Sequence, residues 1–320
     1  MTSSISVTVP ATTANIGPGF DCLGAALGLY NHFEFEQLAA GASAVTITAE
    51  GLEADRLSIG SDNLIYQSFL HLYEAIQLSP PPVKIRIRLN VPLSRGLGSS
   101  ATAIVGGLVG ANAIAHYPLS SEEILKLAVE LEGHPDNVAP ALLGSCQLSV
   151  CGPDGKTVCI PVDWASNIIA IAAIPDFELS THEARSVLPA SCSYTDAVYN
   201  ASHLALLVKA LESGREDWLR VALNDRLHQP YRAGLIRGYQ AVQNAAVEAG
   251  ACGLVISGAG PTLLALSPAS CKQTVASAIH QAWESEGVSA QVLTLPLDYQ
   301  GTQACSQTNQ SASLQVSSAV

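Results

Sequence analysis

Residues 92–102 read PLSRGLGSSAT, and the rest of the chain can be interpreted outward from them. Residues 83–91 (VKIRIRLNV) come before them and alternate apolar with polar side chains, a period of two that predicts a half-buried strand. Residues 101–117, which overlap the end of the stretch, are rich in Ala, Ile, Val and Leu and contain no proline, which predicts a buried helix. The predicted order is therefore strand, glycine-rich turn, helix.

The turn between this strand and helix has the features of an anion-binding loop. Gly96 and Gly98 let the backbone bend and approach a ligand closely, and Ser99, Ser100 and Thr102 are expected to cap the helix. The first N–H groups of the helix then face the turn, where the helix dipole favours an anion such as a phosphate. The lysine of a Walker A loop is absent. On these residues alone, a turn that only caps a helix remains an alternative.

Composition narrows the class of protein. The chain has 320 residues, which suggests one or two domains, and its 48% hydrophobic and 13% charged residues can form a large core. The net charge of −12 argues against a nucleic-acid surface. The eight cysteines form no CxxC pair and no zinc-type pattern with histidine, and no secretion signal or membrane-spanning run is recognisable. We expect a cytoplasmic protein with small-molecule partners, no nucleic acid and no membrane, and we expect a homodimer.

Three further blocks accompany the glycine-rich turn. They are residues 10–27 (PATTANIGPGFDCLGAAL), 130–145 (ELEGHPDNVAPALLGS) and 250–266 (GACGLVISGAGPTLLAL). In this order and spacing, the four blocks resemble the small-molecule kinases of the GHMP family, and in detail its homoserine kinase branch. The resemblance covers about residues 6–266.

The resemblance implies an α+β fold of two domains. Residues 1–160 would form an N-terminal, ribosomal S5 domain 2-like, ATP-binding domain that carries the glycine-rich loop. Residues 161–300 would form the C-terminal GHMP kinase domain, a ferredoxin-like α/β sandwich. Residues 301–320 are polar and low in complexity, which predicts a disordered tail.

The resemblance also implies ATP and Mg²⁺ as cofactors. The implied ATP-binding residues are Asn63, Pro92, Leu93, Ser94, Arg95, Gly96, Leu97, Gly98, Ser99, Ser100, Ala101 and Thr102. Asn63 has a structural alternative as a second cap, beside Ser61, of a helix expected within residues 61–78. The metal ligands are expected to be Ser100 and Glu130. Glu132 is the second choice for the glutamate, because the segment from this glutamate to His134 looks shorter than in several relatives.

The substrate implied by the resemblance is L-homoserine, phosphorylated on its side-chain hydroxyl to O-phospho-L-homoserine in threonine biosynthesis. The implied substrate-binding residues are Asn15, Asp21, His134, Asp136, Arg185, Arg232 and Gly260. Carboxylate and amide groups suit an ammonium, and the planar guanidinium suits a carboxylate. Turn, surface and helix-end roles are the structural alternatives for these residues.

The implied catalytic residues are Asn137, Thr181 and Arg185. Asn137 falls where other branches of the family carry an aspartate that can take the hydroxyl proton. A neutral amide cannot act as a base, so the expected mechanism depends on positioning, metal and dipoles.

Two other functions fit parts of the sequence. Another branch of the same family would phosphorylate a sugar or mevalonate, and a nucleotide-sensing protein would keep the fold without catalysis. A Rossmann oxidoreductase is poorly supported, because no acidic residue is well placed after a GxGxxG turn in an early βαβ unit.

Overall fold

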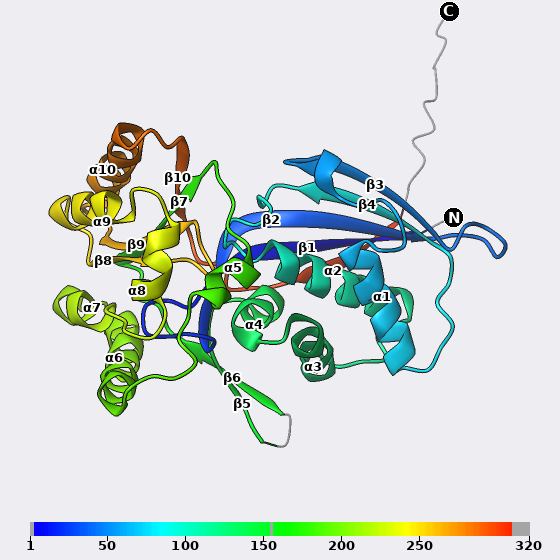
Figure 1. The fold of residues 1–320 in the computed structure, drawn as a ribbon. Helices are drawn as coiled ribbons and strands as arrows, with labels where there is room; N and C mark the ends of the chain where they lie inside the picture. Colours follow the sequence, from blue (N-terminus) through cyan, green and yellow to red (C-terminus); the bar gives the residue numbers. More distant parts are fainter. Residues whose placement is uncertain (1–2, 154–155, 309–320) are drawn as a thin grey trace, which may run out of the picture.

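The computed structural model describes residues 3–153 and 156–308, which form two sheets with helices packed against them (Figure 1). The larger sheet has seven strands: β1 (Ser3–Ala14), β2 (Leu23–Gln37), β3 (Val45–Gly51), β4 (Val83–Leu89), β5 (Cys146–Cys151), β6 (Thr157–Val162) and β11 (Gln303–Thr308). Five strands follow the order β11-β1-β2-β4-β3, while β5 pairs with β2 and β6 with β5. Only the β3–β4 pair among these is parallel.

Four helices lie on one face of the larger sheet (Figure 1). They are α1 (Leu64–Ala75), α2 (Ser99–Ile114), α3 (Ser121–Glu132) and α4 (Pro135–Leu143). The predicted alternation of β4 is confirmed, because Val83, Ile85, Ile87 and Leu89 are all buried. The predicted helix after the glycine-rich turn is α2, which is buried along most of its length.

Three glycines bring α2 close to its neighbours. A Cβ at Gly106 would lie 2.5 Å from the Phe33 ring, and one at Gly110 would lie 2.3 Å from the Phe35 ring. At Gly107 a Cβ would lie 2.3 Å from the backbone oxygen of Ile65 in α1. The glycines that interrupt the apolar run therefore allow close helix packing.

The smaller sheet has the antiparallel order β10-β7-β9-β8. Its strands are β7 (Ile168–Pro175), β8 (Gly253–Ile256), β9 (Leu263–Pro268) and β10 (Ala290–Leu295). The helices around it are α5 (Thr181–Ser186), α6 (Tyr194–Ser213), α7 (Glu216–Ala222), α8 (Gln229–Arg232), α9 (Tyr239–Glu248) and α10 (Lys272–Ser285). The second domain also contains the short 3₁₀ turn η2 (Ala233–Leu235), and the first domain contains η1 (Ala54–Arg56).

This sheet is buried on both faces. Ile171 and Leu263 pack into a core with side chains of α9 and α10. Ala172 and Leu264, one residue further along each strand, pack into another core with side chains of α6 and α7. The continuous apolar run of β7 follows from this double burial.

The second of these cores also joins the two domains. It includes Ala11, Leu23 and Cys146 from the larger sheet. Strand β6 runs to Val162 and still belongs to that sheet, so the change of domain falls slightly later than residue 160.

The predicted disordered tail is wrong for residues 303–308. They form β11, which pairs with β1 and returns the chain to the first domain. Backbone hydrogen bonds hold this edge strand, and exposed side chains such as Gln303 and Cys305 leave no apolar pattern to recognise. Residues 301 and 302 of the predicted tail are also ordered, since the Gly301 N–H donates to Asp298 and the Thr302 N–H to the Leu142 oxygen. Residues 309–320 lie outside the described residues.

Within the described part of the chain, none of the helices combines the length and apolar character needed to cross a membrane.

The contact at Gly107 gives a test of the α1–α2 packing. We expect Gly107→Ala to lower the free energy of unfolding by about 1–3 kcal/mol, because the new Cβ would overlap backbone atoms that cannot rotate away. Urea unfolding measures the change. Gly234→Ala is the control, since a Cβ there meets nothing within 4 Å. Equal stability of Gly107→Ala and the wild type would contradict the tight packing described above.

Candidate active site

A pocket lies where the glycine-rich turn meets the second domain. Its lining comes from the β1–β2 loop, the turn itself, the α3–α4 corner, the segment around α5, α8 and the loop after β8. The lining residues are Asn15, Ser94, Gly96, Gly98, Ser99, Ser100, Glu132, His134, Asn137, Leu179, Thr181, Arg185, Arg232, Gly258, Ala259 and Gly260. Four sequence blocks that are far apart in the chain therefore converge on one cavity.

The glycine-rich turn winds through left-handed backbone. Ser94, Gly96 and Gly98 have φ values of 53°, 75° and 68°. A Cβ at Gly96 would lie 2.3 Å from the Ser257 oxygen, and one at Gly98 would lie 2.0 Å from Thr12 Oγ1. Glycine is required at both positions by conformation and by space.

The helix that follows the turn begins without a side-chain cap. Its N-cap is Gly98, which makes no side-chain hydrogen bond, so the predicted caps Ser99, Ser100 and Thr102 are wrong. Thr102 Oγ1 instead donates to the Ser99 oxygen and accepts from Asn31 Nδ2. The N–H groups at the start of α2 stay open on the side where Ser99 and Ser100 line the pocket.

The predicted ATP-binding residues divide into two groups. Ser94, Gly96, Gly98, Ser99 and Ser100 line the pocket. The others lie outside its lining: Pro92, Leu93, Arg95, Leu97, Ala101 and Thr102, of which Leu97, Ala101 and Thr102 are fully or almost fully buried.

Asn63 has the structural role that was its alternative. Its Oδ1 accepts the Ile65 N–H at 3.0 Å as the N-cap of α1, and its Nδ2 donates to the Ser58 oxygen. Ser61, the cap expected from the sequence, does not hold that position.

Arg95 connects the turn to the second domain. Its guanidinium donates to the carbonyl oxygens of Pro175 (3.2 Å) and Asp176 (3.0 Å). It also lies 3.1 Å from a carboxylate oxygen of Glu178 and 3.4 Å from one of Glu53. The side chain is buried and is not part of the pocket lining, so it acts as a clamp between the domains.

The two candidate glutamates of α3 point in different directions. Residues two apart on a helix are about 200° apart around its axis. The Glu132 carboxylate accepts the Ser100 hydroxyl at 2.9 Å and lines the pocket, and burial raises its pKa. The Glu130 carboxylate instead lies 3.7 Å from His71 Nε2 and 3.9 Å from Lys126 Nζ, outside the pocket. The geometry favours the second choice, Glu132.

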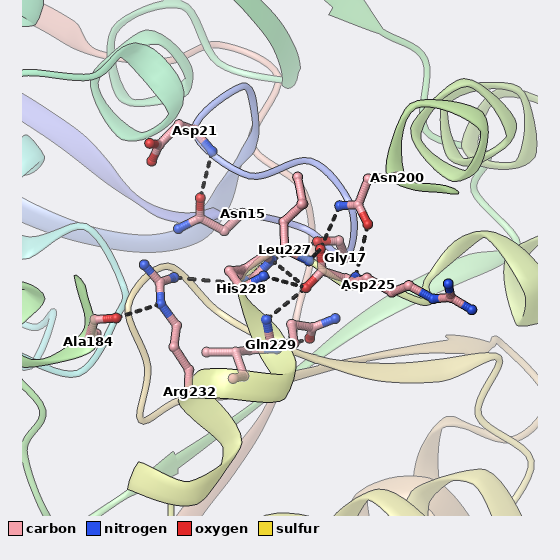
Figure 2. A network of polar contacts seen from close by, with 12 residues as sticks. Asn15, Gly17, Asp21, Ala184, Asn200, Asp225, Leu227, His228, Gln229 and Arg232 are labelled. Carbon is pink, nitrogen blue, oxygen red and sulfur yellow. Dashed lines mark hydrogen bonds and ion pairs between the residues drawn. The ribbon is translucent and has the colours of Figure 1, made fainter. Parts of the chain in front are cut away.

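The β1–β2 loop supplies the opposite wall. Asn15 Nδ2 donates to the Gly258 oxygen. Its Oδ1 accepts the Asp21 N–H (Figure 2). The Asp21 carboxylate receives two hydrogen bonds from Arg185, at 2.7 and 3.2 Å. Asn15 and Asp21 have φ values of 57° and 54°, a left-handed conformation that these side chains tolerate.

Arg232 brings a second guanidinium into the pocket. It is buried, and donates to the Ala184 oxygen (Figure 2). It also donates to the Gly258 oxygen. Burial, and next the charge of Arg185, lower its pKa to about 10, so it stays charged at neutral pH. Phe20, which the sequence analysis missed, lies close to both: its ring centre is 5.6 Å from Arg185 Cζ and 5.1 Å from Arg232 Cζ. Two cations beside one ring form a site for an anion.

A polar network holds α8 and Arg232 against the β1–β2 loop. The Asp225 carboxylate accepts the N–H groups of Leu227, His228 and Gln229 and the Asn200 amide (Figure 2). His228 Nε2 lies 2.8 Å from the Gly17 oxygen, and its ring stacks on Phe20.

His134 and Asp136 form a pair at the start of α4. Their Nδ1 and Oδ1 atoms are 2.6 Å apart, and this hydrogen bond raises the pKa of His134. Asp136 is fully buried and does not line the pocket, so the direct substrate contact predicted for it does not fit its position. One ligand atom each from Asp21, His134 and Asp136 lies within 4.8 Å of the others, which makes this corner favourable for a cation.

The comparisons with known proteins agree with this arrangement. The GHMP kinases N terminal domain matches residues 63–145 and the GHMP kinases C terminal domain matches residues 207–287. The homoserine kinase of Crocosphaera subtropica (strain ATCC 51142 / BH68) is 56% identical over 93% of this chain and 97% of its own. The chain belongs to the GHMP kinase family, in its homoserine kinase branch. The homoserine kinase of Trichormus variabilis (strain ATCC 29413 / PCC 7937) is 55% identical over 93% of this chain and 98% of its own.

A solved GHMP kinase shares the whole architecture. The crystal structure of homoserine kinase from Cytophaga hutchinsonii superimposes with a TM-score of 0.86 at 29% identity, covering 94% of this chain and 97% of that one. The family and the two-domain α+β fold class predicted from the sequence are confirmed. The roles of individual residues stay predictions.

The position of Arg95 gives a test that separates clamping from nucleotide contact. We expect Arg95→Met to lower the free energy of unfolding by about 1–3 kcal/mol, because it leaves the carbonyl oxygens of Pro175 and Asp176 without their donor. It also removes one of the two guanidinium groups that pair with Glu53 and Glu178, the other being that of Arg56. Arg88→Met is the control, since its side chain is 66% exposed and its pair with Glu50 is worth less than about 0.5 kcal/mol. Urea unfolding without nucleotide compares them. Unchanged stability of Arg95→Met would contradict the clamp.

Proposed function

We propose that this protein transfers the γ-phosphoryl group of ATP to the side-chain hydroxyl of L-homoserine and so makes O-phospho-L-homoserine for threonine biosynthesis. The observation that carries the proposal is the pocket itself. It joins the uncapped N-terminus of α2 to a pair of guanidinium groups from the second domain, in a chain of the homoserine kinase branch. The first feature suits phosphates and the second suits an amino acid carboxylate.

The phosphates of ATP would lie over the start of α2, against Gly98, Ser99 and Ser100. Backbone N–H groups and the helix dipole stabilise negative charge there without a lysine. The chain's negative net charge is compatible with this, because the stabilisation is local.

Mg²⁺ would be held by Ser100 and Glu132. The donor set fits, since both offer oxygen atoms, lie in hydrogen-bond contact and leave the remaining positions to phosphate and water. A nearby cation also favours the charged form of the partly buried Glu132 carboxyl, whose pKa is raised by burial. When bound, Mg²⁺ neutralises charge on the β- and γ-phosphates.

The amino acid would bind at the other end of the pocket. Arg185 and Arg232 would hold its carboxylate, with His134 and Gly260 on the walls. Asp21, which does not itself line the pocket but pairs with Arg185, would hold its ammonium. Asp21 and Arg185 pair with each other in this structure, so they already carry the charges complementary to a zwitterion. Asp136 contributes indirectly by holding His134.

The transfer would occur near Asn137 and Thr181, which line the pocket beside the start of α2. A bond forms between the homoserine hydroxyl oxygen and the γ-phosphorus, the bond from that phosphorus to the ADP oxygen breaks, and the hydroxyl proton passes to a phosphoryl oxygen. Asn137 cannot remove the proton. In a loose transition state the substrate hydroxyl needs to lose little of its proton before the phosphoryl group is transferred.

The activity has a direct test. We expect ADP release from Mg·ATP that requires L-homoserine and stops with EDTA, with mevalonate, galactose and L-serine run in parallel as competing alcohols. Activity on another alcohol but not on homoserine would overturn the substrate assignment. ATP binding without turnover on any of them would favour a non-catalytic, nucleotide-sensing role.

The metal assignment has a matched pair of variants on one helix. We expect Glu132→Gln to raise the Mg²⁺ concentration for half-maximal rate by at least about tenfold, because it removes a charged oxygen ligand. Glu130→Gln should leave it unchanged, since Glu130 lies outside the pocket. Titrating Mg²⁺ at saturating ATP and homoserine measures both. If Glu130→Gln raises this Mg²⁺ concentration and Glu132→Gln does not, Glu130 is the metal ligand.

Two further properties belong to the proposal. A cytoplasmic location suits eight free cysteine thiols, and cell fractionation tests it. A homodimer is the expected assembly, which light scattering on the purified protein measures.

A further inference from the structure

Thr12 is buried directly beneath the phosphate-binding turn. It lies in β1 with no exposed surface, and its N–H donates to the Leu97 oxygen of the turn at 3.1 Å. Its hydroxyl donates to Asn137 Oδ1 at 2.8 Å. One residue therefore contacts both the turn and the amide at the proposed point of transfer.

In this structure the contact orients the Asn137 amide, because its Oδ1 accepts the Thr12 hydroxyl. An amide is planar, with its oxygen and its NH₂ group on opposite edges, so a bond that holds Oδ1 also sets the direction of the NH₂ group. Asn137 lines the pocket, and its oxygen is turned to Thr12. The NH₂ group is thus the end available to a ligand.

The pair lies against the backbone of Gly98. A Cβ built on Gly98 would lie 2.0 Å from Thr12 Oγ1 and 3.2 Å from Asn137 Oδ1. Both polar atoms thus lie close to the glycine backbone at the start of α2, where a side chain at position 98 would otherwise be.

We propose that Thr12 is a positioning residue for phosphoryl transfer: its hydroxyl holds Asn137 with the NH₂ group donating into the pocket, toward the substrate hydroxyl oxygen that attacks the γ-phosphorus. This inference rests on the proposed function. A donated hydrogen bond occupies one lone pair of the substrate hydroxyl and leaves another directed at the γ-phosphorus. Asn137 then orients the nucleophile instead of accepting its proton. Because Thr12 also bonds to Leu97, the orienting group is held in register with the phosphate turn.

A double-mutant cycle tests the inference. We expect Thr12→Val to lower kcat by roughly 10–100-fold with KM for ATP and homoserine within about twofold, because misorientation affects transfer more than binding. Thr12→Ser keeps the hydroxyl and should restore most of the rate. In an Asn137→Ala background, Thr12→Val should cause no further loss, since the amide that it positions is gone. Thr46→Val is the control, because Thr46 is exposed on β3 away from the pocket.

NMR of the Asn137 side-chain amide requires no enzymatic turnover, so it can also be applied to variants of very low activity. The side-chain amide resonances of Asn137, assigned by their loss in Asn137→Ala, should shift in Thr12→Val and stay near their wild-type positions in Thr12→Ser. Thermal unfolding of each variant separates this effect from a loss of folding.

Three results would overturn the inference. They are additive losses in the double mutant, equal impairment of Thr12→Val and Thr12→Ser, and Asn137 amide resonances that Thr12→Val leaves in place. Each leaves the activity intact in the wild type. Failure of the proposed function is a different result, namely no homoserine-dependent turnover by the wild type.

Discussion

The arrangement depends on one close approach, where the backbone at Gly98 lies against Thr12 with no room for a Cβ. This contact seats the first turn of α2 on β1, so that its unpaired N–H groups open into the pocket. Gly96 makes the same kind of contact with the loop after β8, whose Ser257 hydroxyl donates to the Gly96 oxygen at 2.7 Å. The turn is thus held by the first domain on one side and by the second on the other.

The charges of the pocket follow from what surrounds it. The chain has a net charge of −12, but the electrostatic potential in the pocket has local positive contributions. They come from the N-terminal end of α2 and from the side chains of Arg185 and Arg232. Each arginine is stabilised by a different means: Arg185 by the Asp21 carboxylate, and Arg232 by carbonyl oxygens and the face of Phe20. A buried guanidinium requires such partners, because an unpaired buried charge is strongly unfavourable.

The part of the site in the first domain and the part in the second are held together by buried contacts. The connection is therefore more rigid than a hinge between separate domains. Arg95 connects the turn to the segment that leads into α5, and the core shared by Ala11 and Leu23 continues into the smaller sheet. Strand β11 then brings the chain back to β1. Relative movement of the phosphate and amino acid sites would have to disturb buried apolar contacts as well as hydrogen bonds.

The sequence by itself determined the elements and the family. Alternation in β4, the apolar run of β7 and the strand–turn–helix order around Gly96 and Gly98 are local patterns, and a period of two or a glycine in a turn is visible in one dimension. The four motif blocks indicated the GHMP kinases and most residues that line the pocket, because each block is a short stretch with characteristic chemistry.

The tertiary structure decided what depends on the direction of side chains and on partners that are distant in the chain. Glu132 rather than Glu130 reaches Ser100 because of the rotation of α3 against α2, Asp136 lies behind His134, and Asn63 caps a helix. Phe20, Thr12 and strand β11 carry no local signal, since their roles come from residues more than a hundred positions away in the chain, and only folding brings those together.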